Sequence, residues 1–432
     1  MTTDFGGARH AVPQAVHRSP GAFPAVLLAA GRPLTLRGAG HSCDGQTVTD
    51  AEMLVTWSRN GTAAAVRDLG EGLVEVPAGT SWYIVERYLN QRGRSFPVLT
   101  DHLPVSVGGT LSVGGIGVGS VRYGMQIDHV ERIQLTDGVG ISRWCSRTDH
   151  PELFRFALGG LGSLGLIERV VLRTVPHQPY IHVRHRRHST LAELIAYTEQ
   201  IAQRDDIDIY CGSLRRGVLR STTGRHSDPR RCDGDAPGFA VERLRVPADH
   251  ARTTALPDDR VRMWSDYLVP AGLLEPMVDA LRRRVRLDRL SVMLYLLVVR
   301  RSPSATPFAF APAGPAPVSI GLGVYASVPR ESAAMAAIRR MFGELMSACY
   351  ELGGRPYLYG IHDFDDASAQ RLYGPDLDRL AQLRVSHSLE HVNAHLALVE
   401  AAQRDPTGRA VTARETQGDS ARADSAAGTE SV

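Results

Sequence analysis

The spacing of apolar and polar residues predicts short, mixed elements in the first part of the chain. It predicts one short helix followed by two strands, at 22–30, 33–37 and 72–79. A longer helix is expected at 80–93, because Thr80 or Ser81 can cap its start and Gly93 can end it. This part of the chain should therefore mix helices and strands, with many glycines in the loops between them.

Two further patterned segments follow before the composition changes near Pro176. Residues 129–146 indicate a β-hairpin that turns around Asp137 and Gly138. Residues 150–175 read as a short helix, a glycine loop and a strand. Together with the preceding elements, they complete an N-terminal α and β unit.

From Pro176 to about residue 350, longer apolar runs predict a second unit. Strands are expected at 180–185, 207–214, 263–270, 290–300 and 318–328. Helices are expected at 190–204, 276–285 and 331–352. This alternation favours an antiparallel sheet covered by helices, and the polar stretch 219–260 is expected to be a long surface insertion. Residues 404–432 have few apolar side chains and are expected to be disordered.

Composition excludes several classes of function. With 43% hydrophobic and 22% charged residues, the chain has the composition of an ordinary soluble protein, and its net charge of +3 gives no support for nucleic-acid binding. All 49 basic residues are arginine, which excludes a lysine Schiff base and a Walker A lysine. The five cysteines form no CxxC pair, and no apolar run approaches membrane-spanning length. We expect no signal peptide, because the apolar run AVLLAA is short and lies late in the N-terminal segment. We therefore expect a cytoplasmic protein with reduced thiols and no membrane partner.

Two glycine-rich loops are the first candidates for a binding site. The segment 37–47 reads RGAGHSCDGQT, and the segment 106–120 reads SVGGTLSVGGIGVGS. Neither has the GxGxxG spacing of a Rossmann fold, since Cys43 occupies the third glycine position in the first loop. Glycine-rich backbone can still present N–H groups to a diphosphate, and ordinary tight turns are the alternative.

Three other groups of residues have simpler explanations. His182, His185 and His188 could suggest a metal site, but residues three apart on a strand point to opposite faces, which favours a solvated strand. Cys211 is expected to be a small buried apolar residue. The acidic cluster Asp363, Asp365 and Asp366 lacks the glycine and final glutamate of a calcium loop, which favours a polar helix start.

Asp101 lies between apolar residues just before the second glycine loop. A buried carboxylate there would have a raised pKa, as a catalytic base has. A turn or capping role is the alternative.

Taken together, these segments resemble the FAD-dependent oxidoreductases of the vanillyl-alcohol-oxidase type, and cytokinin dehydrogenases in particular. The resemblance covers residues 31–177 and returns weakly near the C-terminus. RGAGHSCDGQ is similar to the family's RGxGHSxxGQ, and TDHLPVSVGGTLSVGGIG to TDYLxxTVGGTLSNAGI. RYG and LGGLGSLGLIERV also match the segments that follow in the family.

The resemblance implies an α+β, two-domain PCMH-type FAD-binding fold. The FAD-binding domain would span 1–177 and the substrate domain 178–350, and 351–403 would return to the first domain. FAD would be bonded covalently through His41 alone, because no cysteine lies in 101–109; a noncovalent loop histidine is the alternative. Asp101 would act as the general base. The cofactor contacts implied are Gly38, Ala39, Gly40, His41, Ser42, Gln46, Asp101, Ser106, Gly108, Gly109, Ser112, Ile116, Ile167 and Tyr357.

Two departures from the family pattern concern the substrate and the cofactor. Cys211 stands where cytokinin dehydrogenases carry a glutamate that holds the adenine, and the C-terminal DPxxxLxPGQ segment is replaced by SLEHVNAHLA. The predicted activity is therefore oxidation of a C–N or C–O bond in a small molecule other than a cytokinin, as a step in bacterial specialised metabolism. Dioxygen or another acceptor would take up the electrons. An alcohol or sugar oxidase of the same fold, or a noncatalytic flavin-containing binder, is the alternative.

Overall fold

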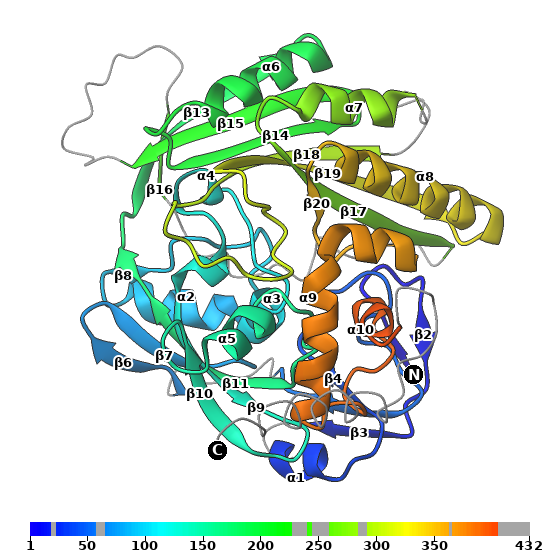
Figure 1. The fold of residues 1–432 in the computed structure, drawn as a ribbon. Helices are drawn as coiled ribbons and strands as arrows, with labels where there is room; N and C mark the ends of the chain where they lie inside the picture. The colour runs from blue at the N-terminus through cyan, green and yellow to red at the C-terminus, as the bar shows by residue number, and fades with distance from the viewer. Residues whose placement is uncertain are drawn as a thin grey trace, which may run out of the picture.

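The computed structural model describes residues 1–18, 23–57, 65–226, 240–243, 259–283, 292–362 and 365–404. In these residues the strands form two large sheets and three small ones (Figure 1). Each large sheet has its own hydrophobic core. Mixed α and β structure with antiparallel sheets agrees with the predicted fold class, whereas the domain boundaries stay a prediction.

The first core is built on a five-stranded antiparallel sheet in the order β10-β9-β11-β7-β6. Its strands are β6 (Arg67–Gly70), β7 (Leu73–Pro77), β9 (Val130–Thr136), β10 (Ser142–Ser146) and β11 (Leu166–Arg173). The predicted hairpin is β9 and β10, and Asp137 closes its turn by accepting hydrogen bonds from Val139 N and Ile141 N. The other predicted strands and the helix at 150–175 are also present.

Beside this sheet lies a small parallel sheet that leads into the first glycine loop. It has the order β3-β5-β4, with β3 (Ala15–Arg18), β4 (Leu34–Arg37) and β5 (Glu52–Val55). The two-stranded sheets pair β1 (Thr2–Thr3) with β2 (His10–Ala11), and β8 (Arg94–Ser95) with β12 (Val175–Pro176). The β12 strand ends where the composition changes.

Helices pack against the first core. They are α1 (Pro24–Ala29), α2 (Trp82–Asn90), α3 (Val107–Leu111), α4 (Ser120–Tyr123), the 3₁₀ turn η2 (Gln126–His129) and α5 (Pro151–Ala157). The sequence predicts α1, α2 and α5 but not α3, α4 or η2, which lie in or just after the segment 106–120 that reads as a glycine-rich loop. Ser81 caps α2, since its hydroxyl accepts a hydrogen bond from Ile84 N. The side chains of Trp82, Val85 and Leu89 then face the core, which is the helical spacing the sequence indicated.

The second core is built on an eight-stranded sheet in the order β16-β13-β15-β14-β18-β19-β17-β20, in which every described pair is antiparallel. Its strands are β13 (Tyr180–His188), β14 (Ile209–Arg215), β15 (Val218–His226), β16 (Ala240–Arg243), β17 (Arg260–Pro270), β18 (Val292–Arg300), β19 (Val318–Pro329) and β20 (Arg355–Pro356). Helices α6 (Leu191–Ala202), α7 (Leu274–Arg282) and α8 (Ser332–Glu351) lie over the face that points away from the first core (Figure 1).

Segments from beyond residue 300 return to the first core. Phe308 and Phe310, in the loop between β18 and β19, pack there against Phe154, Phe156 and other core side chains. Helices α9 (Asp366–Ser386) and α10 (Ala397–Ala402) also contribute to it. The sequence patterns predicted many of the strands and helices of both cores, but they did not indicate β3, β5, β6, β15 or α10, nor that the β18–β19 loop would bridge the two cores.

Two predictions need correction. The stretch 219–260 is not wholly an insertion, because β15 and β16 lie within it and pair with β13 and β14. The histidines of β13 are not all solvated: His188 is buried and its Nε2 lies 2.8 Å from the Ser221 hydroxyl. The described residues contain no group of three side chains suited to a metal ion.

Other predictions fall partly or wholly outside the described residues. Asp365 caps α9 by accepting a hydrogen bond from Ser368 N, as a polar helix start requires. Asp363, Cys232 and the predicted tail beyond Arg404 lie outside the described part of the chain. Within the described part, no helix has both the length and the apolar character needed to cross a membrane.

Candidate active site

A cavity of about 580 Å³ lies where the two cores meet. The first core contributes the two glycine loops and the segment 161–167 to its wall. The second contributes side chains from β14, β17, β18 and β19 and from residues 357–359. A ligand in this cavity would therefore contact both parts of the chain.

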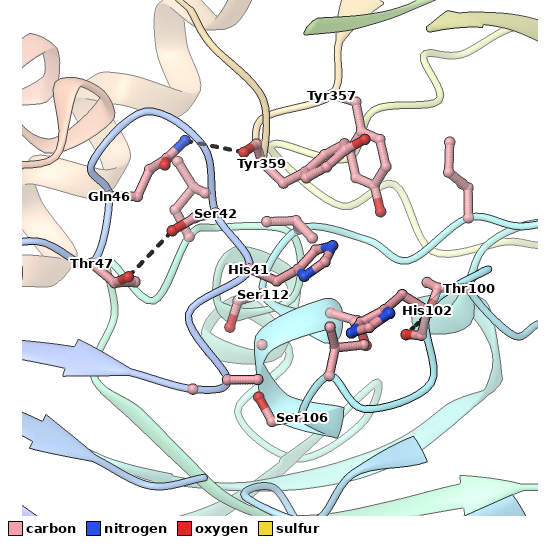
Figure 2. A pocket seen from close by; sticks show the side chains of 18 of the residues that line it. His41, Ser42, Gln46, Thr47, Thr100, His102, Ser106, Ser112, Tyr357 and Tyr359 are labelled. Atoms are coloured by element: carbon pink, nitrogen blue, oxygen red, sulfur yellow. Dashed lines mark hydrogen bonds between the residues drawn. The ribbon is translucent and has the colours of Figure 1, made fainter. Parts of the chain in front are cut away.

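All fourteen residues that the sequence placed at a cofactor site line this one cavity. They are Gly38, Ala39, Gly40, His41, Ser42, Gln46, Asp101, Ser106, Gly108, Gly109, Ser112, Ile116, Ile167 and Tyr357. Figure 2 shows His41, Ser106, Ser112 and Tyr357 around the same space. Segments far apart in the sequence thus converge as expected, while the individual roles of these residues stay predictions.

The two glycine loops lie directly against each other. A Cβ atom at Gly38 would collide with the Ser106 hydroxyl, so glycine at this position lets the two loops lie together with the Ser106 hydroxyl where it stands. Gly40 has a φ of 73°, which disfavours any residue with a side chain. Ser106 Oγ is buried and has no hydrogen-bond partner among the described residues. A buried hydroxyl of this kind is stabilised when a ligand supplies the missing hydrogen bond.

His41 stands at the tip of the first loop among aromatic rings. Its ring centroid lies 3.7 Å from that of Phe5, 4.7 Å from that of His102 and 6.0 Å from that of Trp264. Burial, together with smaller contributions from the nearby His102 and Arg262, lowers the pKa of His41 to about 3. The imidazole is therefore neutral at physiological pH, so a ring nitrogen keeps the free electron pair that a nucleophile needs.

The rest of the first loop is held by hydrogen bonds within the loop and to the backbone at 358–362. Gln46 donates from Nε2 to Gly360 O at 3.0 Å, and its Oε1 accepts a hydrogen bond from Asp44 N at 2.8 Å. The Ser42 and Thr47 hydroxyls lie 3.2 Å apart (Figure 2). These contacts fix the loop to residues 357–362, so the loop is ordered by both parts of the structure.

Asp101 reaches the cavity from the loop between β8 and α3. Its side chain is accessible from the cavity but protein atoms surround it on most sides, and this burial raises the pKa of Asp101. A side-chain hydrogen bond from Tyr295 on β18 acts in the opposite direction, because it stabilises the carboxylate. Asp101 is thus a carboxyl group with a raised pKa on the wall of the cavity, and its role as a catalytic base stays a prediction.

Cys211 lies next to Asp101 and Tyr295. Burial and, to a smaller extent, the charge of Asp101 raise the pKa of Cys211, hydrogen bonding with Tyr295 opposes them, and the resulting pKa is about 11. The thiol is therefore uncharged at neutral pH. The residue that replaces the expected glutamate thus lies close to the candidate base, although it is only partly buried and packs against the first core.

Tyr357 closes the cavity from the C-terminal side. Its hydroxyl hydrogen-bonds to the backbone of Gly115 and Ile116 in the second glycine loop, and its backbone N–H donates to Asp266 O at 2.8 Å. The ring of Tyr359 lies 4.6 Å away in an edge-on arrangement. Tyr357 therefore joins the second glycine loop to the eight-stranded sheet.

Sequence reasoning missed several residues of the cavity wall. They include Trp264, Asp266, Tyr295, Tyr325, Tyr359 and Asn393. One signal was available for Asp266, since it is a charged residue within the apolar run MWSDYLVP. The tyrosines carried no such signal, because aromatic residues are common in any buried strand.

Asn393 occupies the replaced C-terminal segment. Its Oδ1 accepts a hydrogen bond from Leu36 N at 2.8 Å, and its Nδ2 donates to Gly162 O at 3.0 Å. The buried guanidinium of Arg384 donates to three carbonyl oxygens nearby, those of Ser163, Leu389 and Val392. SLEHVNAHLA thus still reaches the cavity wall and ties together the ends of two loops.

The cavity fits FAD on structural grounds. The glycine cradle admits a ligand close to the backbone, Ser106 Oγ is an unpartnered buried hydroxyl, and His41 offers a neutral nitrogen. A volume of about 580 Å³ lies in the range of small-molecule and cofactor sites. The residues present therefore suit the group that the sequence resemblance implied.

Residues 24–146 match the FAD binding domain family. This part of the chain is therefore similar to FAD-binding domains. An uncharacterized oxidoreductase in a fasciation locus of Rhodococcoides fascians is 38% identical over 181 residues, which cover 40% of this chain and 41% of that protein. Cytokinin dehydrogenase 5 of Oryza sativa subsp. japonica is 35% identical over 193 residues, covering 40% of this chain and 36% of the relative.

A third relative, cytokinin dehydrogenase 4 of Arabidopsis thaliana, is 40% identical over 147 residues, covering 33% of this chain and 28% of that protein. The predicted resemblance to cytokinin dehydrogenases is therefore confirmed. In each case the match spans less than half the length of the curated relative.

Proposed function

We propose that this protein is an FAD-dependent oxidoreductase that removes a hydride from a C–N or C–O bond of a small molecule. One observation carries the proposal: the cavity brings the loops of an FAD-binding domain together with Asp101, a carboxyl group of raised pKa. A domain that only bound flavin would have no need of a proton acceptor on the same wall.

Bound FAD supplies a two-electron acceptor for the hydride that leaves the substrate carbon. Asp101 would accept the proton from the substrate N–H or O–H, so that the carbon–nitrogen or carbon–oxygen bond becomes double. The raised pKa suits a general base, because proton transfer is most effective when the pKa of the base approaches the working pH. Tyr295 would orient the carboxylate through its hydroxyl.

The eight-stranded sheet would shape the pocket around the substrate. Leu268, Met293 and Leu297 contribute apolar side chains to the cavity wall, whereas Asp101 and Tyr295 contribute polar groups. Apolar walls exclude water and strengthen the hydrogen bonds made inside the site. The substrate would therefore be held in a mostly dry space beside the base.

His41 would form one covalent bond to the flavin. The neutral state of its imidazole supports this, because only an unprotonated nitrogen can form such a bond. The described residues of the segment 101–109 contain no cysteine that could form a second bond. His41 is accordingly the single attachment point in this proposal.

The substrate would differ from a cytokinin. Several relatives are named cytokinin dehydrogenases, but Cys211 replaces the glutamate expected from the sequence resemblance and lies beside Asp101 and Tyr295. An uncharged thiol cannot accept hydrogen bonds from an adenine ring as a carboxylate does. Dioxygen or another acceptor would then reoxidise the protein.

A spectroscopic experiment tests the proposal. The purified protein should show the visible absorption of an oxidised flavin, and the colour should stay with the polypeptide after acid precipitation. Anaerobic addition of amines and alcohols from a substrate panel should then bleach the flavin with at least one compound. A protein that holds flavin but is reduced by no member of a broad panel would favour the noncatalytic binder, and a colourless protein that cannot be reconstituted with FAD would refute the proposal.

A further inference from the structure

Asp266 is a second carboxyl group on the cavity wall, and the proposed chemistry does not use it. It lies on β17 opposite Gly323 on β19, and its side chain is 8% exposed. A Cβ atom at residue 323 would collide with Asp266 Oδ1, so the glycine leaves the room that the carboxyl group occupies. This pairing places a charged residue inside a sheet whose neighbouring positions are apolar.

In the described structure, only tyrosine hydroxyls form hydrogen bonds with the side-chain carboxyl group of Asp266. Tyr325 donates a hydrogen bond to Asp266 Oδ1 at 3.0 Å, and Tyr359 makes a further side-chain hydrogen bond to the carboxyl group. Within the described residues, Asp266 Oδ2 is buried without a partner and no arginine forms a salt bridge with Asp266. Burial raises the pKa of Asp266 to about 6, so at neutral pH most molecules carry a buried negative charge with no cation beside it.

Three aromatic side chains line the cavity near the Asp266 carboxyl group. The Trp264 ring lies 5.5 Å from the Tyr325 ring and 6.0 Å from the Tyr359 ring, between centroids. All three side chains line the cavity. The faces of aromatic rings attract cations, and a carboxylate among such rings is a common arrangement for binding an ammonium group.

We propose that Asp266, Tyr325, Tyr359 and Trp264 form a subsite for the ammonium group of the substrate, which makes the substrate an organic amine. The ammonium would donate a hydrogen bond to Asp266 Oδ2 and contact the aromatic faces. This inference rests on the proposed function, because it takes the cavity as the place where the substrate meets flavin. A neutral alcohol or sugar would leave the carboxylate without a counter-charge.

Tyr325 connects this subsite with the candidate base. The charges of both Asp266 and Asp101 raise the pKa of the Tyr325 hydroxyl, so the ring lies within the electrostatic reach of both carboxyl groups. An amine bound at Asp266 would therefore extend past Tyr325 toward Asp101, where its oxidisable bond would lie. The two carboxyl groups would have different roles: Asp266 holds the charge and Asp101 takes the proton.

Calorimetric titration with a matched pair of probes tests the subsite. The probes are 2-phenylethylammonium and 2-phenylethanol, which have similar shape and differ in charge, added anaerobically to the flavin-containing protein at pH 7.5. Asp266→Asn removes the charge and keeps the size. Asp208→Asn is the control, because Asp208 is a buried carboxyl group paired with Arg122 away from the cavity.

We expect the wild-type protein to bind the ammonium probe at least about tenfold more tightly than the alcohol. Asp266→Asn should weaken ammonium binding by about thirtyfold or more, the scale for losing one partner of a buried charge pair, and should change alcohol binding by less than about threefold. Asp208→Asn should leave both affinities within about threefold. Equal binding of the two probes to the wild-type protein, or an equal loss of both in Asp266→Asn, would overturn the inference.

A pH experiment in the Asp101→Asn background tests the subsite should Asp266→Asn fail to fold, because Asp101 is the other carboxyl group with a raised pKa on the cavity wall. The titratable groups that face Asp266 are Cys43, Tyr325, Tyr357 and Tyr359, all with pKa values raised by burial, so none of them gains or loses a proton between pH 5 and 7.5. Ammonium binding should weaken about tenfold from pH 7.5 to pH 5 as Asp266 is protonated, and alcohol binding should not. A pH-independent preference would contradict the subsite.

The outcome separates this inference from the proposed function. Binding is measured as heat, so it is read whether or not the flavin is reduced. A flavoprotein that oxidises an alcohol and binds both probes equally would refute the ammonium subsite alone. A protein that prefers the ammonium probe through Asp266 but holds no flavin would refute the oxidoreductase and keep the subsite.

Discussion

The imidazole rings of His41 and His102 are stacked, with their centroids 4.7 Å apart and their planes inclined by 15°. The two residues come from different glycine-rich regions, so the stack joins the first loop to the segment that carries Asp101. It also contributes to the low pKa of His41, since two neighbouring imidazoles disfavour each other's positive charge. The ring that would bond to flavin is therefore both oriented and neutral.

The first prediction concerns that bond. Mass spectrometry of a tryptic digest should find the flavin adduct on the peptide 38–59, which contains His41. His41→Ala should abolish the adduct, because the nucleophilic nitrogen is lost, while noncovalent flavin still binds. His102→Phe keeps an aromatic ring in the stack and should keep the adduct. An unmodified peptide from a fully yellow preparation would show that flavin binds noncovalently.

The second prediction concerns Asn393, which holds the ends of two loops through its side chain. Asn393→Gly removes both side-chain hydrogen bonds but tolerates the positive φ of 50° at this position. Leaving Leu36 N and Gly162 O unsatisfied should lower the free energy of unfolding by about 1–3 kcal/mol and reduce the flavin content per polypeptide. Denaturant unfolding and the ratio of visible to protein absorbance measure the two effects.

Ser388→Gly is the matched control for Asn393→Gly. Ser388 lies in the same C-terminal segment with a φ of 52°, so glycine relieves backbone strain there in the same way. We expect this variant to be as stable as the wild-type protein or slightly more so. An equal loss of stability in both variants would show that the backbone, and not the Asn393 side chain, matters.

The third prediction concerns cytokinins. Because Cys211 lies beside Asp101 and Tyr295 and its thiol is uncharged, the site lacks the carboxylate expected to hold an adenine. Anaerobic mixing with isopentenyladenine should leave the flavin oxidised. Cys211→Glu should increase binding of isopentenyladenine, measured as a perturbation of the flavin spectrum, whereas Cys211→Ser should not. Rapid bleaching of the wild-type protein would show that Cys211 does not decide the substrate.

Local signals in the sequence were sufficient for most helices and strands. The capping hydroxyl of Ser81 and the turn residue Asp137 act within five residues of their own positions, so the printed sequence contains the whole interaction. The glycine loops could also be predicted, because close backbone approach requires glycine regardless of the partner. The fourteen predicted site residues therefore line one cavity.

Interactions between distant segments could not be read in this way. The β15 strand is polar, and pairing with β13 and β14 stabilises it where local hydrophobicity does not. Phe308 packs into the first core from the loop between β18 and β19. The Asn393 side chain hydrogen-bonds to Leu36 and to Gly162, each of which is more than 200 residues away in the sequence. Such contacts depend on the assembled fold, and no spacing rule along one segment predicts them.

The last prediction concerns Asp101 as the general base. Asp101→Asn keeps the size of the side chain and can still hydrogen-bond to Tyr295, but it cannot take a proton. Flavin reduction by a substrate that the wild-type protein oxidises should slow by about a hundredfold or more, the usual scale for losing a positioned acid–base group. Stopped-flow reduction, measured per bound flavin, separates this loss from a loss of cofactor. Tyr295→Phe is the companion variant, since it removes the hydrogen bond to the carboxylate and leaves the base in place.

The pH dependence of reduction provides the decisive check on Asp101. Because burial raises its pKa, the carboxyl group stays protonated, and therefore inactive as a base, up to a higher pH than an ordinary aspartate. The reductive rate should fall as the pH is lowered through that raised pKa. In Tyr295→Phe the fall should begin at a still higher pH, because the carboxylate loses a stabilising donor. In Asp101→Asn this limb of the profile should be absent. A near-normal rate per flavin in Asp101→Asn, with the acid limb retained, would assign the proton transfer to another group and leave Asp101 only a role in shaping the loop.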